Sequence, residues 1–171
     1  MAALIIFAFL IFCSGDPLSL ISAVLCHEAG HVLAAWLIAK ELPQISFSIA
    51  GMRLSYIGLS KPSEQITVSA AGPFASILLG LMFFDSRSFS LFSLGLGIVT
   101  LLPAACLDGG GILRAATEKF FLPQVAYKLC RAVSIVTIML VFILDCAVQL
   151  KYGTNMSLAI ITVYLVYRTV G

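Results

Sequence analysis

Charged side chains are scarce in this sequence. Only 11% of its 171 residues are Asp, Glu, Lys or Arg, whereas about a quarter are charged in an average soluble domain. Hydrophobic residues make up 61% of the chain, and the mean hydropathy is +1.10. A chain this apolar is a membrane protein. No polar stretch is long enough to form a second, soluble domain, so we expect residues 1–171 to form a single membrane domain.

A strong charge of one sign, a cysteine framework and a secretion signal are also missing. The net charge of +2 and the scattered basic residues exclude a nucleic-acid surface, so no nucleic-acid partner is expected. The five cysteines are an odd number without CxxC spacing, which is typical of small hydrophobic residues rather than of disulfides. The apolar N-terminus has no basic region, so we do not expect a cleaved signal peptide.

Apolar stretches that approach the length of a membrane span recur along the chain. A spanning helix needs about 20 mostly apolar residues, and we predict an all-α polytopic membrane protein with about six transmembrane helices. The predicted spans are residues 1–13, 18–39, 66–84, 88–107, 130–150 and 156–170, of which the first and last are short. Residues 117–128 mix basic and aromatic side chains, which predicts a connector at the membrane surface.

A different pattern separates the second and third predicted spans. Residues 44–59 partly alternate and are rich in β-branched and aromatic residues with glycines, which predicts a β-hairpin. Irregular backbone at membrane depth is tolerated only where it is buried in protein or lines a wet cavity. We therefore predict a membrane-embedded hairpin that lies against the helix before it.

The basic residues are distributed unevenly between the two sides of this predicted topology. With a cytoplasmic N-terminus, the inside segments hold eight of the ten Lys and Arg residues. The positive-inside rule then places the end of the second span, the hairpin and Asp108 toward the cytoplasm. The inside residues are Lys40, Arg53, Lys61, Arg114, Lys119, Lys128, Arg131 and Arg168, and the outside residues are Arg87 and Lys151.

The second predicted span carries three ionisable residues, His27, Glu28 and His31. Ionisable groups within a span cost about 2.5 to 3.5 kcal/mol each and mark function by default. His27 and His31 are the only histidines of the chain, and a spacing of four places both on one helix face, where they can bind one metal ion. Glu28 would then reach a water molecule beside the metal. The alternative is a buried polar cluster satisfied by neighbouring helices.

A catalytic zinc site needs a third protein ligand, because it usually has three ligands and one open position. Asp108 is the acidic residue set in a patterned segment, since it follows Pro103 and precedes three glycines at 109–111. Pro103 frees a backbone carbonyl and bends the helix, and the glycines let backbone pass close to another element. Alternatively, Asp108 caps a helix that starts near Gly111. These residues alone leave both interpretations open.

Three elements in order resemble the site-2 protease family of intramembrane metalloproteases. They are the HEAGH motif in an apolar span, the Ala71-Gly72-Pro73 segment in the next span, and a later LDGG motif. The resemblance covers roughly residues 17–116. It implies that His27, His31 and Asp108 bind one zinc ion per chain, and that Glu28 is the catalytic acid and base. The short form without a PDZ insertion is similar to the sporulation-type subgroup, which cuts membrane-associated pro-sigma factors.

The resemblance also implies how substrate binds. The hairpin near Gly51 would present an edge strand on which an unwound substrate helix pairs, and Thr100 and Pro103 are assigned to substrate binding with it. Two positions depart from the family pattern: Thr100 stands where the family usually has Asn, and Cys106 where it often has Pro. Thr100 keeps one hydroxyl donor without the reach of the amide, so this departure concerns substrate handling more than metal binding.

The sequence thus predicts an intramembrane zinc metalloendopeptidase in a bacterial cell membrane, with its active site toward the cytoplasm. Its expected partners are a membrane-protein substrate, such as a pro-sigma or anti-sigma factor, and the lipid bilayer; no regulator is indicated. One alternative is a metal transporter with the histidines as a transit site, against which the single ionisable cluster and the missing internal repeat argue. Another is an inactive relative that binds membrane substrates without cutting them; the intact HExxH motif and the aspartate argue against it, and Thr100 argues weakly for it.

Overall fold

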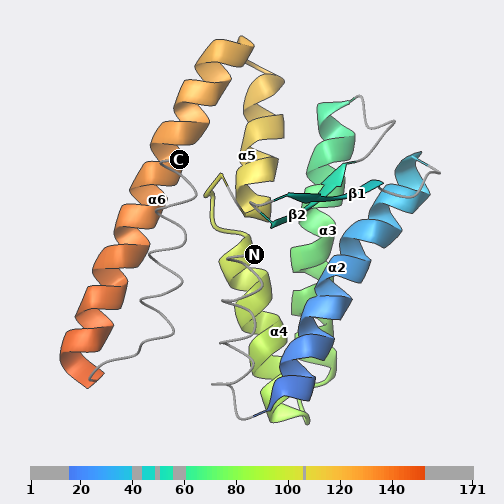
Figure 1. Cartoon of the computed structure of the whole chain (residues 1–171), viewed down its shortest axis with the longest axis vertical. Helices are drawn as coiled ribbons and strands as arrows, with labels where there is room; N and C mark the ends of the chain where they lie inside the picture. The colour runs from blue at the N-terminus through green and yellow to red at the C-terminus, as the bar shows by residue number, and fades with distance from the viewer. Residues whose placement is uncertain (1–15, 40–43, 49–50, 56–60, 106, 153–171) are drawn as a thin grey trace.

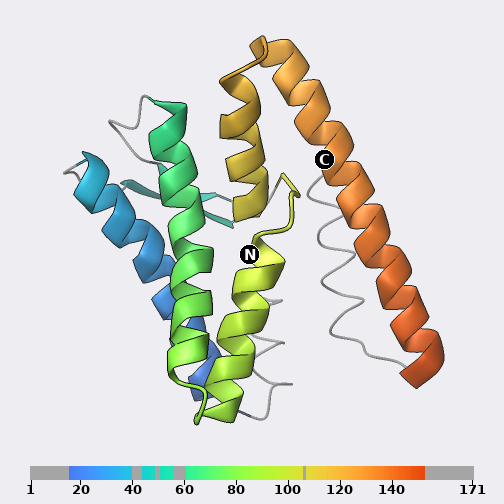
Figure 2. The same cartoon turned by 180° about the vertical axis from the view of Figure 1, so that it is seen from behind.

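The chain folds into helices and one short β-hairpin in the computed structural model, which describes residues 16–39, 44–48, 51–55, 61–105 and 107–152. Helices α2, α3 and α4 lie side by side, α5 follows α4 end to end, and α6 leans away from the others on the far side of α5 (Figures 1 and 2). The predicted spans 1–13 and 156–170 lie outside the described residues. The elements are α2 (Pro17–Ala39), β1 (Gln44–Ser48), β2 (Gly51–Ser55), α3 (Pro62–Met82), α4 (Arg87–Thr100), α5 (Asp108–Glu118) and α6 (Pro123–Tyr152).

Three of these helices are long and apolar enough to cross a bilayer, over Pro17–Ile38, Pro62–Met82 and Pro123–Leu144. Large apolar side chains on them face outward: Leu25 is 64% exposed and Phe74 is 68% exposed. The buried positions hold small residues such as Ala23, Ala35 and Ser76. Small residues let helix backbones approach closely, and lipid covers the large apolar side chains outside. This arrangement is that of a membrane protein and confirms the class expected from composition.

Helix α2 begins at Pro17, directly after Asp16. Asp16 accepts a hydrogen bond from the backbone N–H of Ser19 at 3.2 Å and another from the Ser19 hydroxyl at 2.7 Å. Asp is a preferred N-cap residue, and Pro17 suits the first helical position because its missing N–H would have no helical partner there. This cap sets the start of the helix that carries the two histidines.

The predicted fourth span, residues 88–107, is wrong as a single helix. Helix α4 ends at Thr100, an irregular segment follows, and α5 begins at Asp108. Pro103 explains the break, because it has no N–H and its ring clashes with the preceding turn. At 1.5 Å per residue α4 is about 21 Å long, less than the roughly 30 Å of a hydrocarbon core. Figure 1 accordingly shows α4 in the lower half of the structure and α5 in the upper half. Helix α6 alone extends over both halves.

This broken crossing places the start of α5 at mid-height rather than at one end of the bundle (Figure 1). Asp108 is the first residue of α5, so it does not cap a helix that starts near Gly111. Protein covers the middle of the irregular segment, where Ala104 is 1% exposed and packs with Ile138 of α6 and with Leu107, whereas Leu101 and Ala105 are exposed. Such cover is what irregular backbone needs at membrane depth.

Two other helices begin earlier than predicted. Helix α3 starts at Pro62 instead of residue 66, and α6 starts at Pro123 instead of residue 130. The connector predicted for residues 117–128 is therefore mostly helical, with only a short turn between Glu118 and Pro123. Proline is favoured in the first helical turn, which explains both early starts.

The predicted hairpin is present between α2 and α3. Strands β1 and β2 pair antiparallel, with Gln44 opposite Ser55 and Ser48 opposite Gly51. Figure 1 shows both strands crossing beside α2 and α3 in the upper half of the structure. Embedding of this hairpin in the membrane remains a prediction.

Candidate metal centre

Helices α2 and α3 run antiparallel and bring two matched sets of residues together. His27 and His31 lie one turn apart on α2, and Val68, Gly72 and Ser76 lie one turn apart on α3. Positions four apart share one helix face. Because the helices run in opposite directions, His31 meets Val68 and His27 meets Ser76. The four-residue spacing of the HEAGH motif therefore has a counterpart on the neighbouring helix.

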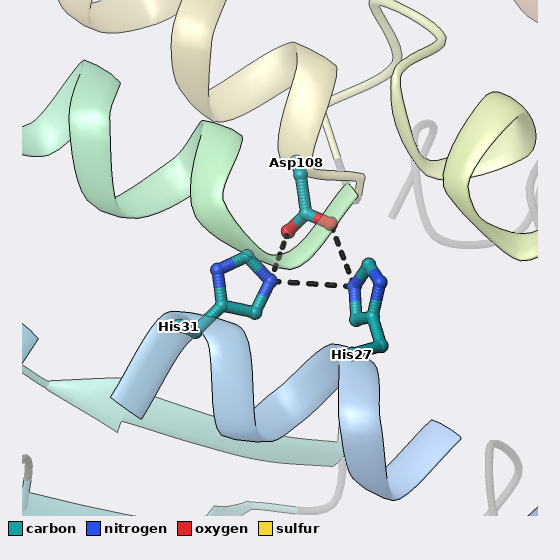
Figure 3. Close-up of side chains that lie close together, drawn as sticks. All are labelled: His27, His31 and Asp108. Atoms are coloured by element: carbon teal, nitrogen blue, oxygen red, sulfur yellow. Dashed lines mark hydrogen bonds and ion pairs between the residues drawn. The ribbon is translucent and has the colours of Figure 1, made fainter. Parts of the chain in front are cut away.

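The third member of the cluster arrives from the break between α4 and α5. Asp108 begins α5 and points its carboxylate toward both imidazoles (Figure 3). The close approach depends on the glycines after it. A Cβ on Gly109 would overlap the carbonyl oxygen of Leu101, and a Cβ on Gly110 would overlap that of Ala104. The LDGG motif thus lets the start of α5 lie directly against the irregular segment.

The three side chains converge on one point (Figure 3). Nε2 of His27 lies 3.1 Å from Oδ2 of Asp108, and Nε2 of His31 lies 3.4 Å from Oδ1. The two Nε2 atoms are 3.3 Å apart, and the rings meet edge to face at 82°. The structure thus brings together residues that lie up to 81 positions apart in the chain.

In each imidazole, the hydrogen bond made by Nδ1 bears on whether Nε2 carries a proton or a lone pair. Nδ1–H of His31 donates to the carbonyl oxygen of Val68 at 2.8 Å, and a carbonyl can only accept. In the neutral ring this leaves a lone pair on Nε2 of His31. Nδ1 of His27 lies 2.9 Å from Oγ of Ser76, a hydroxyl that can either donate or accept. Outer hydrogen bonds of this kind orient histidines that bind metals.

A tetrahedral zinc ion fits this donor set. Zinc holds imidazole nitrogen and carboxylate oxygen at about 2.0 to 2.2 Å, which places tetrahedral ligand atoms about 3.3 to 3.6 Å apart. The two Nε2 atoms are 3.3 Å apart, and each lies 3.1 or 3.4 Å from a different oxygen of Asp108, while one ligand atom from each residue can be chosen so that all three lie within 4.8 Å of one another. Nε2 lone pairs and carboxylate oxygens are all acceptors and repel one another at these distances. A cation or protons between them are therefore needed to hold them together. Two imidazoles and one carboxylate also form a ligand set of catalytic zinc sites, which keep a fourth position open.

The cluster is closed on the histidine side and open on the aspartate side. The side chains of His27 and His31 are 6% and 8% exposed, whereas that of Asp108 is 25% exposed. Gly72 lies directly under the His31 ring, because a Cβ there would overlap Nε2. Glycine at this position therefore keeps open the space that the imidazole occupies.

Glu28 lies beside the cluster on α2 and is half-buried. Adjacent residues on a helix point about 100° apart, so its carboxylate does not share the histidine face. Its side chain makes no hydrogen bond with any of the residues that the structure describes. The expected role of Glu28 as acid and base stays a prediction.

The residues assigned to substrate binding lie outside the cluster. Thr100 ends α4, and its hydroxyl donates to the carbonyl oxygens of Leu96 at 2.9 Å and Gly97 at 3.3 Å. Its single proton is therefore engaged within its own helix. Pro103 lies half-buried in the irregular segment, and Gly51 begins β2. Their contribution to substrate binding remains a prediction.

Sequence reasoning missed the α3 residues that hold the imidazoles. Ser76 and Val68 are both buried, and neither was predicted to be part of the site. A signal was available, since Val68, Gly72 and Ser76 repeat the four-residue spacing of the two histidines. Serine and valine are common in apolar spans, however, so the spacing gains meaning only once α3 is known to pack against α2.

Comparison with known proteins gives a family and a fold. Residues 1–107 match the family described as Peptidase M50B-like. Among solved structures, the fold is similar to that of the site-2 protease from Methanocaldococcus jannaschii, with a TM-score of 0.67 and 21% sequence identity over 98% of this chain and 84% of that chain. No curated protein matches this chain. The family match ends one residue before Asp108, so the position of this carboxylate comes from the structure.

Proposed function

The chain belongs to the site-2 protease family, among the M50B-like peptidases, and from this membership we propose that it is an intramembrane zinc metalloendopeptidase. Its proposed substrates are membrane-associated or single-span proteins, cut near the cytoplasmic side of a bacterial cell membrane. The resemblance to the sporulation-type subgroup favours a pro-sigma or anti-sigma factor as the substrate class.

One observation carries the proposal, namely the meeting of two Nε2 atoms and a carboxylate within 4.8 Å of one another. His27, His31 and Asp108 would hold the zinc ion. When bound, zinc supplies Lewis acidity, which polarises the scissile carbonyl and makes water acidic enough to lose a proton near neutral pH.

The remaining chemistry belongs to Glu28. Its carboxylate takes a proton from the attacking water, whose oxygen bonds to the carbonyl carbon of the scissile peptide. The carbon–nitrogen bond then breaks, and Glu28 delivers the proton to the leaving amine nitrogen. The half-buried position of Glu28 next to His27 supports this assignment. A substrate helix must also unwind locally, because its carbonyls are otherwise engaged in helical hydrogen bonds.

A metal transporter is less well supported than a protease. A transit path needs several polar or ionisable groups along the membrane. In the part of the chain that the structure describes, His27, His31 and Asp108 form the single cluster suited to a metal ion. An ion held by three residues around one point fits catalysis at that point better than passage through it.

The proposal is tested by replacing the base while keeping the ligands. Glu28→Gln has the same shape but cannot accept the proton, so we expect cleavage to fall by about 10²- to 10⁴-fold. Zinc content should stay near that of the wild type, because Glu28 is not among the three converging residues. Detergent-purified protein is incubated with a panel of single-span and pro-sigma-type substrates, with and without chelator, and zinc is measured by mass spectrometry.

Glu64→Gln is the matched control. It makes the same chemical change in the first turn of α3, where Glu64 pairs with Lys61 at 4.0 Å, so cleavage should not change. Undiminished proteolysis by the Glu28→Gln protein would remove Glu28 from its assigned role. A zinc-loaded wild type that cuts no substrate of the panel would instead favour the inactive relative.

A further inference from the structure

We propose that Ser76 is a positioning residue of the metal centre, which holds His27 in the one tautomer that can bind the metal through Nε2. The inference rests on the proposed function for the identity of the metal site. It assigns a role on α3, outside the HEAGH and LDGG motifs.

The contact between Ser76 and His27 is buried on both sides. Ser76 is 0% exposed and His27 is 4% exposed, and Oγ lies 2.9 Å from Nδ1. A buried polar group that has neither a hydrogen-bond partner nor access to water destabilises the protein by about 1 to 3 kcal/mol. The two side chains are therefore bound to each other in whichever direction the proton lies.

The direction of that proton decides whether His27 can be a ligand. If the Ser76 hydroxyl donates to Nδ1, the neutral ring carries its proton on Nε2 and has no lone pair facing Asp108. If Nδ1–H donates to Ser76, the lone pair lies on Nε2, which is 3.1 Å from the Asp108 carboxylate. Metal binding requires the second arrangement, in which Ser76 acts as the acceptor.

The two histidines therefore have different kinds of hydrogen-bond partner at Nδ1. Nδ1 of His31 faces the Val68 carbonyl at 2.8 Å, a backbone acceptor that no side-chain substitution removes. Nδ1 of His27 depends on a hydroxyl, which a single substitution removes. Loss of Ser76 should therefore affect His27 and leave the tautomer of His31 unchanged.

Ser76→Ala tests this assignment through metal affinity. Loss of an outer hydrogen bond to a metal-binding histidine typically costs 10- to 100-fold in affinity, so we expect the zinc Kd of the full chain to rise by that factor. The Kd is measured by competition with a chelator in detergent, with Asp108→Ala as the reference for a lost ligand.

The matched control is Ser93→Ala. Ser93 is 1% exposed on α4, and its hydroxyl has no hydrogen-bond partner among the described residues. The variant thus removes a buried serine hydroxyl elsewhere, and its zinc Kd should equal that of the wild type. An equal loss of affinity in both variants would mean general loosening and would overturn the proposal.

A second readout does not depend on metal. Because the chain has two histidines, ¹⁵N-histidine labelling gives four ring-nitrogen signals. In metal-free protein the Asp108 carboxylate also faces Nε2 of His27 and favours Nε2–H, so the expected effect of Ser76→Ala is a shift of the His27 Nδ1 signal, which loses its hydrogen-bond partner, while the His31 pair stays in place. Unchanged His27 signals and an unchanged Kd would overturn the assignment. If the wild type binds zinc no better than Asp108→Ala, the proposed function fails, and the nitrogen signals still decide the role of Ser76.

Discussion

Gly72 shows how closely individual residues control the metal centre. It lies on the α3 face that packs against the histidines. Its neighbours on that face are Val68 and Ser76, which form hydrogen bonds with the two rings. A side chain at this position would occupy the space of the His31 imidazole. The glycine of the Ala71-Gly72-Pro73 segment is thus needed for close approach to a ligand rather than for an unusual backbone angle.

Gly72→Ala should remove zinc without unfolding the protein. The added Cβ would overlap Nε2 of His31, so the ring must turn away from Asp108, and overpacking of this kind costs about 1 to 3 kcal/mol. We expect zinc content to fall below about a tenth of the wild-type value. Mass spectrometry of purified protein measures the metal, and thermal denaturation measures the fold.

Gly95→Ala on α4 is the control for that variant. A Cβ at Gly95 meets nothing within 4 Å, so the same substitution should retain zinc and stabilise the helix by about 0.5 to 1 kcal/mol. Full zinc content in the Gly72→Ala protein would show that the ring and the added methyl group can coexist, contrary to the geometry.

At the scale of elements, the α4–α5 break is what delivers the carboxylate. A continuous helix over residues 88–107 would carry Asp108 past the histidines. Instead, α4 stops at Thr100 and α5 starts at mid-height with Asp108 as its first residue (Figure 1). The apolar pattern extends through residue 107, which explains why hydropathy predicts one span there. Pro103 and the three glycines were visible in the sequence, but their effect on the path of the chain required the fold.

Gly109→Ala should disturb this break and the metal together. Its Cβ would overlap the carbonyl oxygen of Leu101, so the start of α5 must shift and take Asp108 with it. We expect a loss of stability of about 1 to 3 kcal/mol in the metal-free protein and weaker zinc binding. Thermal denaturation with and without zinc separates the two effects.

Gly111→Ala makes the same change two residues later. There the Cβ would meet the Ser69 hydroxyl at 3.0 Å, the end of a side chain that can turn away. This variant should lose less stability and keep its zinc. Equal behaviour of the two glycine variants would argue against a special role for the contact between Gly109 and Leu101.

On the scale of the whole molecule, the topology can be tested from its two ends. The start of α3 and the turn between α5 and α6 lie at one end of the bundle, and the turn between α3 and α4 lies at the other (Figure 1). Lys61 and Lys119 are exposed at the first end, and Asp85 is exposed at the second. The positive-inside rule predicts that the first end faces the cytoplasm.

Single cysteines at these three positions test the prediction in a variant whose own five cysteines are replaced. In inside-out vesicles a membrane-impermeant maleimide should label Lys61→Cys and Lys119→Cys but not Asp85→Cys, and in intact cells the pattern should reverse. Labelling of Lys61→Cys and Lys119→Cys from opposite sides would contradict the arrangement of α3 to α6 described above.

Local patterns in the sequence determined the membrane class, the second span, the hairpin between α2 and α3, and the shared helix face of His27 and His31. These features depend on composition and on periodicity within one element, which adjacent residues encode directly. Choosing Asp108 from the residues alone left a helix cap as an equal alternative, and the family resemblance favoured the metal.

Only the tertiary structure decided the broken crossing, the hydrogen bonds of Val68 and Ser76 to the two rings, and the separations that suit zinc. The two hydrogen bonds and the contact between His27 and Asp108 join positions at least 37 apart in the chain. Such contacts follow from how helices pack, in what register and at what depth, and no local pattern specifies them.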